Sequence, residues 1–550
     1  MKQGSESGAG LPARVYAEPA ALWLWRLVDW RFLLPPERVT RICYVGDVSS
    51  DELQVIAESG ACVCTDGSSE EADVVVVTHP TPDALTTAAD RVRIDGWVLL
   101  RLGDTRQRVR SRLLTSSVRA WNRRLRRSGL SLSTAHWHAP NAERCSYIVS
   151  LEDRTAIFLM LKRYDGVRFG LLKSMVARTL HRFHCIQLVA RDVTLVAQRQ
   201  RAPGRSNHAE PSALLPLEVE RRIAGDWPPA KLLITPWFEA SRHVVCIYAN
   251  RGKGAGTAVV KLPRRPWDIS GIQREASVLD ALVNHTNSLL GQVPVVREVA
   301  LGERPYLVET VLQGHAVAPE RVRADVEGVL DAANEFIRRL PVTGSTTEDR
   351  EWFARLVTDP LQSVARLGCV AGVNVASLVE ETLDLLVPIA AETLPLIFEH
   401  GDLSHPNLLR MQDGQLGVLD WERADPKGLP LTDLCFLLQY VVECQRRAVE
   451  VPAQRLAFDA AFTGPDAWGR RRIARYLESI GLDIALAPPL IVATWARSSV
   501  SLLPRLVNPD AKVARGIRNG GNDAILGTFL LDRDFALWRH AVERYHMILR

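Results

Sequence analysis

The sequence predicts an α/β domain with a doubly wound parallel sheet over residues 15–225, followed by an α+β domain over residues 230–550. In the first part, short and continuously apolar runs alternate with helical stretches, a pattern typical of parallel strands joined by crossover helices. The second part opens with strand-like runs and continues as stretches of helical periodicity. It also carries a loop and a hairpin rich in polar residues.

The elements of the first domain follow from its apolar runs and the turn residues between them. Residues 73–78 (DVVVVT) are apolar without alternation, which suits a strand covered on both faces. We expect further strands at residues 41–45, 61–64 and 96–101, and helices at residues 51–60 and 82–92.

The order and spacing of these elements resemble a class I methyltransferase-like Rossmann domain, in which residues 185–197 would form the closing antiparallel hairpin. The cofactor loop of that family is rich in glycine, whereas residues 45–50 (VGDVSS) hold a single glycine. A close backbone approach to a cofactor needs residues without a Cβ atom. We therefore expect a domain without methyl-transfer activity, although Asp47 and Asp66 could still bind S-adenosylmethionine.

The composition is that of an ordinary globular protein. The 550 residues are 47% hydrophobic and 24% charged, with a formal net charge of +5, which does not by itself indicate nucleic-acid binding. The nine cysteines are scattered, the first residues lack an apolar signal core, and no uncharged apolar run reaches about 18 residues. These features favour a cytoplasmic protein without a membrane span. Residues 198–229, rich in Pro, Gly and charge, are expected to link the two domains.

The most informative segment of the second domain is residues 400–407 (HGDLSHPN), followed by residues 417–422 (GVLDWE). Between them, Asp413-Gly414 is a strong signal for a two-residue hairpin turn. With that turn, Asn407 would lie directly opposite Asp420, with Cβ atoms roughly 4.5–5.5 Å apart.

This spacing points to phosphoryl transfer. An amide oxygen from Asn407 and a carboxylate from Asp420 could share one Mg²⁺ ion, which prefers few protein oxygens and completes its shell with water and phosphate. Asp402, just upstream, would be free to address a hydroxyl nucleophile. The alternative is a surface loop and hairpin in which the acidic residues occur by chance.

The same residues resemble the catalytic core of the aminoglycoside phosphotransferase and choline kinase-like family, which shares the protein-kinase fold. The resemblance implies a small lobe over residues 230–312 and a helical lobe over residues 313–550. It also implies Asp402 as the catalytic base or hydroxyl-orienting group, Asn407 and Asp420 as Mg²⁺ ligands, and His400 as a support of the loop.

A kinase-like site also needs a cation for the nucleotide phosphates. Lys261 lies near the end of a strand-like run, and Glu275 lies in a predicted helix over residues 269–283. The resemblance implies that they form the Lys–Glu pair of the family. The alternative is a surface lysine at a strand end and an exposed helical glutamate.

The nucleotide contacts are expected at two further places. The phosphate-covering loop should fall between Pro236 and His243, where Ser241 is a candidate contact but glycine is absent. Residues 251–256 (RGKGAG) do not fit a P-loop and are expected to be a turn. The strand and hinge over residues 304–314 would meet the adenine edge through Glu309, Thr310 and Val311.

The rest of the second domain is expected to be helical, with helices at residues 321–339, 376–387, 433–449, 467–480 and 532–549. The second of these should end at Val387, because Pro388 cannot continue it. Asp433 resembles the buried aspartate that braces the catalytic loop in the family.

Two weaker signals lie in the first domain. Residues 101–127 form an arginine-rich amphipathic stretch, which we interpret as a helix covering the sheet, the alternatives being contact with a membrane surface, nucleic acid or an acidic partner. His136 and His138 alternate on a predicted strand, and we assign them a structural role because no third metal ligand accompanies them.

Together these patterns predict a phosphotransferase that uses ATP and Mg²⁺ to phosphorylate a hydroxyl of a small molecule. An aminoglycoside, an amino alcohol, a sugar and a biosynthetic intermediate all remain open as the acceptor. The alternatives are a nucleotide-binding scaffold without turnover, a bifunctional methyltransferase-kinase, and a nucleic-acid binder acting through residues 101–127.

Overall fold

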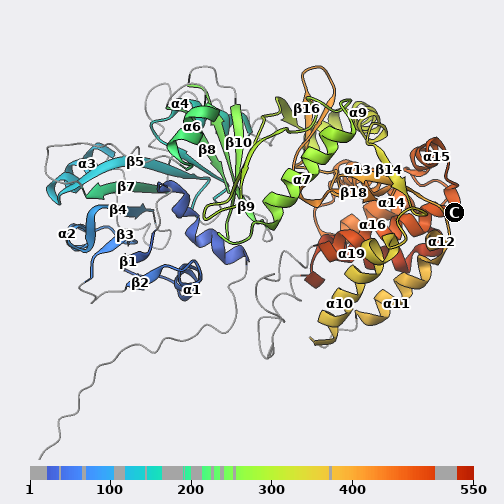
Figure 1. The fold of residues 1–550 in the computed structure, drawn as a ribbon, viewed down its shortest axis with the longest axis horizontal. Helices are drawn as coiled ribbons and strands as arrows, with labels where there is room; N and C mark the ends of the chain where they lie inside the picture. The colour runs from blue at the N-terminus through green and yellow to red at the C-terminus, as the bar shows by residue number, and fades with distance from the viewer. Residues whose placement is uncertain are drawn as a thin grey trace, which may run out of the picture.

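The protein was analysed as a computed structural model (Figure 1). The structure describes residues 22–35, 39–64, 70–103, 118–142, 145–163, 190, 192–199, 214–224, 228–235, 241–251, 256–370, 375–501 and 529–549.

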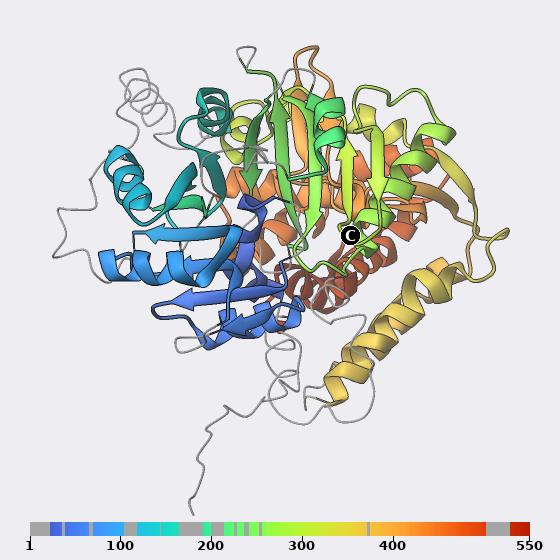
Figure 2. The same ribbon diagram turned by 60° about the vertical axis from the view of Figure 1, so that its left-hand side comes forward.

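A single 12-stranded sheet runs through the first half of the chain, in the order β11-β12-β10-β9-β8-β6-β5-β7-β4-β3-β1-β2. Figure 1 shows the helical lobe to the right of the sheet, and in the rotated view of Figure 2 the helical lobe lies behind the sheet, which comes forward. Its strands are β1 (Arg41–Val45), β2 (Cys62–Cys64), β3 (Ala72–Val77), β4 (Val92–Leu102), β5 (Leu130–Ala139), β6 (Tyr147–Ser150), β7 (Val193–Arg199), β8 (Ala230–Ile234), β9 (His243–Ala249), β10 (Gly256–Pro263), β11 (Val296–Ala300) and β12 (Tyr306–Glu309).

Strands β2, β1, β3 and β4 are parallel neighbours, as predicted. Successive side chains of β1 and β3 enter two separate cores: Ile42, Tyr44, Val74 and Val76 face one, and Cys43, Val45, Val75 and Val77 face the other. The first core lies under η1 (Leu22–Leu33) and α1 (Ser50–Glu58), and the second under α2 (Pro82–Arg91). The parallel part is therefore covered on both faces.

Beyond β4 the sheet becomes antiparallel. Strand β7 pairs antiparallel with β4, as expected for a closing strand, and β5 and β6 follow. The first strand of the expected closing hairpin lies mostly outside the described residues. Strand β6 then pairs antiparallel with β8, so the expected domain boundary near residues 225–230 does not interrupt the sheet.

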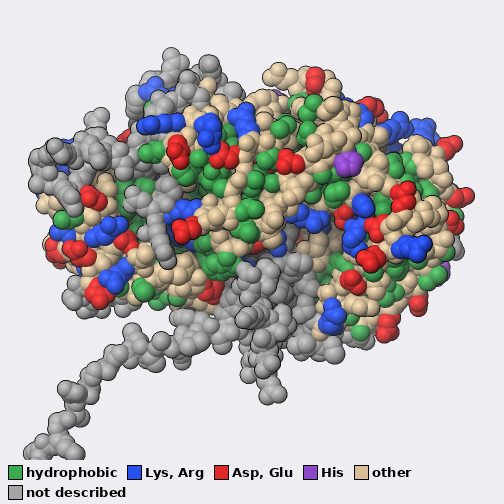
Figure 3. Space-filling view, in the orientation of Figure 1, with side chains coloured by type: hydrophobic (Ala, Val, Ile, Leu, Met, Phe, Trp, Pro, Cys, Tyr) green, Lys and Arg blue, Asp and Glu red, His purple; other side chains and the backbone are tan. Residues whose placement is uncertain are grey.

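Part of the arginine-rich stretch forms α3 (Val118–Arg127), while residues 104–117 lie outside the described part. Trp121 and Leu125 of α3 are buried in the core against the sheet, which agrees with a helix that covers it. On the face in Figure 3, acidic and basic side chains of the described residues are interspersed. His136 and His138 are hydrogen-bonded to Thr134 and Thr194, and burial lowers their pKa values to about 3 and about 4.

The small lobe comprises β8 to β12 with α7 (Ser270–His285) packed on them. The helical lobe surrounds a large separate core and holds two three-stranded sheets, β13-β16-β17 and β14-β15-β18. The remaining strands are β13 (Gly314–Ala316), β14 (Val342–Ser345), β15 (Pro395–Glu399), β16 (Leu408–Met411), β17 (Leu416–Val418) and β18 (Asp425–Gly428). The other helices are α4 (Arg154–Arg163), α6 (Leu217–Ala224), α8 (Pro319–Ala324), α9 (Val326–Arg338), α10 (Asp359–Val370), α11 (Ala376–Leu385), α12 (Val387–Ala390), α13 (Thr432–Arg446), α14 (Val451–Phe462), α15 (Arg470–Ser479), α16 (Ala487–Ser501) and α19 (Arg533–Glu543).

Three predicted helices differ from the structure. The helix expected over residues 532–549 ends at Glu543, and a separate 3-10 turn, Tyr545–Met547, follows it. The helix expected over residues 321–339 is divided into α8 and α9, because Asp325 leaves helical geometry and its side chain caps α9 by accepting from the N–H of Gly328. The helix expected to end at Val387 ends at Leu385. Pro388 then lies in the first turn of α12, where its missing N–H costs no intrahelical bond.

Within the described ranges, no single helix has the length and apolar character needed to cross a membrane. One helix pair, Arg470–Ser479 with Ile484–Ser501, meets those criteria together but is bent by 115°.

Candidate active site

The loop after β15 is held from below by the first turn of α13. Asp433 accepts hydrogen bonds from the backbone N–H groups of His400 and Gly401, each at 2.9 Å. Gly401 has φ +78°, a conformation that glycine adopts without strain. This is the brace predicted for Asp433.

His400 supports the loop from inside the protein. The buried ring contacts the carbonyl oxygen of Leu419 through Nε2 at 2.9 Å, and its Nδ1 accepts the backbone N–H of Asp402 at 3.2 Å. These contacts assign the proton to Nε2, since Nδ1 must accept. The ring also meets Trp421 edge-on, with centroids 4.8 Å apart. His400 therefore has both nitrogens engaged in holding the loop.

Asp402 presents a partly exposed carboxylate. Its Oδ1 accepts from the Ser404 hydroxyl at 2.9 Å, and its Oδ2 lies 3.7 Å from Nη1 of Arg423. The side chain remains 29% exposed, so it can still be approached by a substrate. Two neighbours thus orient the carboxylate without enclosing it.

The register predicted for the hairpin was wrong by one residue. Leu408 pairs with Val418, and the backbone N–H of Leu419 donates to the carbonyl of Asn407 at 2.8 Å. The turn is a three-residue loop that ends at Gly414, which has φ +83°, instead of the two-residue turn expected at Asp413-Gly414. Asn407 therefore lies opposite Leu419, and Asp420 is one residue further along.

Asn407 and Asp420 nevertheless remain at the same end of the hairpin. The Asn407 side-chain amide donates to the carbonyl of Asp402 at 3.1 Å, which leaves its oxygen as the atom suited to a cation. Asp420 adopts a left-handed conformation (φ 64°, ψ 71°) and its side chain is 47% exposed. One amide oxygen and one carboxylate fit Mg²⁺, which retains several waters. Among the described residues, no group of three or more His, Cys, Asp or Glu side chains could hold a metal ion alone.

Lys261 of β10 is buried and lies among three carboxylates, of which those of Glu275 and Glu309 are also buried. Its Nζ is 2.5 Å from Glu275 on α7, 3.6 Å from Glu309 and 3.9 Å from Asp420. Burial alone would lower the pKa of Lys261, but these carboxylates outweigh burial and raise it above its ordinary value. Burial raises the pKa values of Glu275 and Glu309. Each also keeps one buried oxygen, Oε2 and Oε1 respectively, without a hydrogen-bond partner.

The residues expected at the hinge have different environments. Glu309 turns its side chain toward Lys261, a contact that the sequence did not predict. Thr310 is paired with Val295 through both its backbone N–H and its hydroxyl, each at 2.9 Å, so this N–H is not available to a base. Val311 lies beside Gly256, where a Cβ atom would come within 3.1 Å of it.

The candidate phosphate loop joins β8 to β9, and its residues 236–240 lie outside the described part, as do residues 252–255 of the expected β9–β10 turn. The Ser241 hydroxyl donates to the carbonyl of His243 at 3.2 Å. Nδ1 of His243 in turn lies 3.6 Å from Glu422, which follows the β16–β17 hairpin. Burial lowers the pKa of His243 to about 4, so the ring is neutral at pH 7.

Residues 248–476 match the model of the phosphotransferase enzyme family. This part of the chain is a phosphotransferase-family domain. The C-terminal region accordingly has a protein-kinase-like fold, with the antiparallel sheet and α7 in one lobe and helices in the other.

Several solved structures are similar to part of the chain. A thermostable mutant of an aminoglycoside phosphotransferase, in complex with ADP and hygromycin B, is 14% identical over 60% of this chain and 97% of its own, with a TM-score of 0.37. Plasmodium vivax ethanolamine kinase is 11% identical over 60% and 83%, with a TM-score of 0.37. Choline kinase from Streptococcus pneumoniae is 11% identical over 60% and 98%, with a TM-score of 0.34. No curated protein matches the chain.

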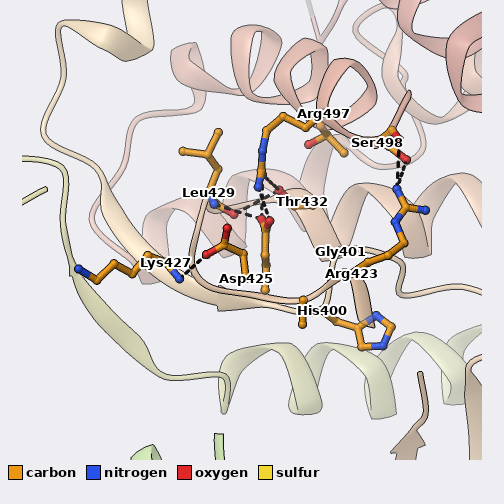
Figure 4. A network of polar contacts seen from close by, with 12 residues as sticks. His400, Gly401, Arg423, Asp425, Lys427, Leu429, Thr432, Arg497 and Ser498 are labelled. Atoms are coloured by element: carbon orange, nitrogen blue, oxygen red, sulfur yellow. Dashed lines mark hydrogen bonds and ion pairs between the residues drawn. The ribbon is translucent and has the colours of Figure 1, made fainter. Parts of the chain in front are cut away.

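Sequence reasoning missed two residues that lie beside the candidate site, Arg423 and His243. Arg423 links Asp402 to α16, where its guanidinium donates to the carbonyl of Ser498 at 3.2 Å and to its hydroxyl at 2.7 Å, as Figure 4 shows. Arg423 directly follows the Asp420-Trp421-Glu422 motif, so its position was a usable signal. His243 gave no such signal, because only the fold brings it to Glu422.

A buried ion pair supports the same loop from the helical lobe. Arg497 of α16 binds both carboxylate oxygens of Glu399, the residue before His400, with Nη1–Oε2 at 2.9 Å. Glu399 also accepts from the N–H of Leu429 at 3.1 Å. Figure 4 shows Arg497 beside Leu429 and Thr432 in this set of contacts. Two cavities of ≈ 390 and ≈ 460 Å³ lie elsewhere in the helical lobe, beside α11 and α9, and neither is lined by these residues.

Proposed function

We propose that the protein is an ATP- and Mg²⁺-dependent phosphotransferase that transfers the γ-phosphate to a hydroxyl of a small molecule. One observation carries the proposal: Lys261 contacts both Glu275 of the small lobe and Asp420 of the helical lobe. A cation for nucleotide phosphates and a carboxylate for a metal ion thus meet at the junction of the lobes. The match of residues 248–476 to the phosphotransferase enzyme family supports it.

Each residue has a role in this proposal. Lys261 binds phosphate oxygens, and Glu275 holds it in place. Asn407 and Asp420 would hold Mg²⁺, which when bound supplies charge neutralisation on the phosphates. Asp402 accepts the proton of the acceptor hydroxyl or orients it for attack, a contribution typically worth about 10²–10⁴ in rate. Arg423 and Ser404 keep the Asp402 carboxylate directed.

The acceptor is a hydroxyl-bearing metabolite, and an aminoglycoside, an amino alcohol, a sugar and a biosynthetic intermediate are the classes to screen. The test measures ADP release from Mg-ATP in the presence of pooled metabolites of these classes, for the wild type and Asp402→Asn. We expect acceptor-dependent ADP release from the wild type, and its loss by about 10²-fold or more in the variant. Equal turnover by both proteins would remove Asp402 from the mechanism.

A nucleotide-binding scaffold without turnover is the second candidate. The absence of glycine from residues 235–243 (TPWFEASRH) favours it, because a phosphate-covering loop usually needs close backbone approach. Binding of Mg-ATP in calorimetry without ADP release in any acceptor pool would establish this alternative.

We propose that the N-terminal unit, residues 15–225, is Rossmann-like and has no methyl-transfer activity. The ends of its parallel strands are occupied by its own side chains. Glu52 accepts from Tyr44 at 2.7 Å, from Trp30 at 3.2 Å and from Arg101 through both oxygens. Heat release on titration with S-adenosylmethionine would contradict this and support a bifunctional methyltransferase-kinase.

A further inference from the structure

A short turn directly after Asp420 lies between the two lobes. Trp421–Arg423 form the 3-10 turn η5, which Ala424 closes by donating its N–H to the carbonyl of Trp421 at 3.1 Å. Helix α7 of the small lobe contacts both η5 and the strand β18 that follows it. Figure 1 shows α7 between the sheet and the helical lobe. The carboxylate of Asp420 is therefore attached to a segment that packs against the small lobe.

Two adjacent residues of α7 bind the two ends of η5. At the start of the turn, the N–H of Trp421 donates to Glu275 at 2.8 Å. At its end, the carbonyl of Ala424 accepts from Nη2 of Arg274 at 2.7 Å. Because Arg274 and Glu275 are neighbours on one helix, η5 cannot shift along α7 without breaking at least one of these bonds.

A third contact lies at the start of α7. The carboxylate of Glu422 is 3.6 Å from Nδ1 of His243, and the buried His243 ring lies directly against the α7 backbone at Gly271. A Cβ atom on Gly271 would come within 2.7 Å of the ring carbon Cε1 and within 3.4 Å of Oε2 of Glu422. A side chain at this position would therefore displace the ring. The middle of η5 thus contacts the small lobe as well as its two ends.

Asp420 itself has φ 64° and ψ 71°, a left-handed conformation that is uncommon for a residue with a Cβ atom. Such a conformation persists where the surrounding structure fixes the backbone on both sides. On one side, the carbonyl of Leu419 accepts from Nε2 of His400 at 2.9 Å. On the other side, the backbone enters η5 at Trp421. The direction of the Asp420 carboxylate therefore depends on the contacts that hold η5.

We propose that Arg274 and Gly271 of α7 are positioning residues of the metal site, which act by holding η5 and thereby the backbone conformation of Asp420. This inference rests on the proposed phosphotransferase function. When a contact to η5 is lost, Asp420 can relax toward a commoner backbone conformation, and its carboxylate turns away from the metal site. Residues that orient a metal ligand without binding the metal typically change metal affinity by about 10–100-fold.

The test uses the full chain and measures the dissociation constant of ADP by calorimetry, once with saturating Mg²⁺ and once with the metal chelated. The ratio of the two constants measures the coupling between metal and nucleotide. We expect Arg274→Met to reduce this ratio about fivefold or more, while the binding of metal-free ADP stays unchanged. A general loss of folding would weaken ADP binding under both conditions, so the ratio separates positioning from destabilisation.

The matched control is Arg339→Met. Arg339 of the helical lobe donates to the carbonyl of Ser288 at 3.0 Å, just beyond the opposite end of α7. This bond is of the same type as that of Arg274 and joins the same two lobes, but it lies at the end of α7 away from η5. We expect Arg339→Met to leave the ratio unchanged.

Gly271→Ala tests the third contact with the same readout. Alanine favours helical structure more than glycine does, so a lower ratio in this variant would not come from a weaker preference of α7 for the helix. We expect the added Cβ atom to displace the His243 ring and to reduce the ratio in the same direction as Arg274→Met. If Arg274→Met does not fold, Gly271→Ala decides the question.

The outcomes are distinct. An unchanged ratio in either α7 variant, or an equal fall in Arg339→Met, would overturn the inference while leaving the proposed function standing. A wild-type chain that binds no ADP, or that binds it equally with and without Mg²⁺, would instead overturn the proposed function itself.

Discussion

The backbone N–H of Trp421 donates a 2.8 Å hydrogen bond to the same Glu275 oxygen that Lys261 approaches at 2.5 Å. One carboxylate therefore joins α7 and β10 of the small lobe to the segment that follows Asp420 in the helical lobe. Its second oxygen is buried without a hydrogen-bond partner. One side chain thus links the position of Lys261 to the segment that follows Asp420.

Glu275→Gln should strongly reduce phosphotransfer. The amide keeps the shape but loses the charge that draws Lys261 into place, and a displacement of about 1 Å can cost on the order of 100-fold in rate. The measurement is kcat/KM for Mg-ATP. Asp280→Asn, an exposed carboxylate on the same helix, is the control and should retain wild-type activity. Equal effects of the two substitutions would argue against the pair.

Asp420→Asn should raise the Mg²⁺ concentration needed for half-maximal activity. Changes near a metal typically cost about 10–100-fold in metal affinity, and this one also removes a charge. Asn407→Ala should act in the same direction. Asp413→Asn at the hairpin turn, whose side chain accepts from Gln415 at 2.9 Å, serves as the control for the hairpin itself. An unchanged Mg²⁺ titration in Asp420→Asn would remove this residue from the metal site.

Asp433 should give the stability of the protein a defined pH dependence. Burial raises its pKa from 3.8 to about 6, against the opposing effects of His400 and the two N–H donors. Between these values the folded protein binds a proton that the unfolded chain does not. The stabilisation of the folded protein by protonated Asp433 is therefore fully present below about pH 4 and is lost as the pH rises through about 6.

Comparison with Asp433→Asn isolates this titration. As the pH falls from about 7 to about 4, the free energy of unfolding of the wild type should rise by up to ~3 kcal/mol relative to that of Asp433→Asn. Urea unfolding measures both proteins. A shift in the opposite direction would mean that the hydrogen-bonded carboxylate, and not the carboxylic acid, is favoured by the fold.

Arg497→Met should destabilise the protein by about 3–5 kcal/mol, because it leaves the buried carboxylate of Glu399 without its partner. The double variant with Glu399→Gln should lose less than the sum of the two single changes. Arg355→Met provides a contrast, since Arg355 is 38% exposed and its pair with Asp425 should contribute less than about 1 kcal/mol. Urea unfolding measures the four variants and the wild type, and additive losses at Glu399 and Arg497 would show that the two residues act independently.

Much of the local structure could be predicted because it depends on neighbours in the sequence. The β-branched run of β3, the strand that carries Lys261 and the helix that carries Glu275 all follow from periodicity and turn residues. Asp433 could be identified through its resemblance to the bracing aspartate of the kinase-like family. The hairpin register could not, since Asp413-Gly414 is compatible with loops of two or three residues that differ by one position in pairing.

Several contacts between distant segments could not be predicted from the sequence. Nothing in the pattern indicated that Glu309 would turn toward Lys261, or that Asp29 would pair with Arg264. The pairing of β6 with β8 was not predicted, because a linker between two separate domains was expected there. Which strands pair depends on packing and not on proximity in the chain.

The chain's own order of residues determined the candidate site: an aspartate, an asparagine and a second aspartate at the spacing of a loop and a hairpin. Local hydrogen bonding and side-chain type suffice for such short segments. Only the tertiary structure decided that one sheet unites the N-terminal unit with the small lobe, and which charges share Lys261. Those arrangements depend on burial, which becomes defined only when segments far apart in sequence exclude water from one another.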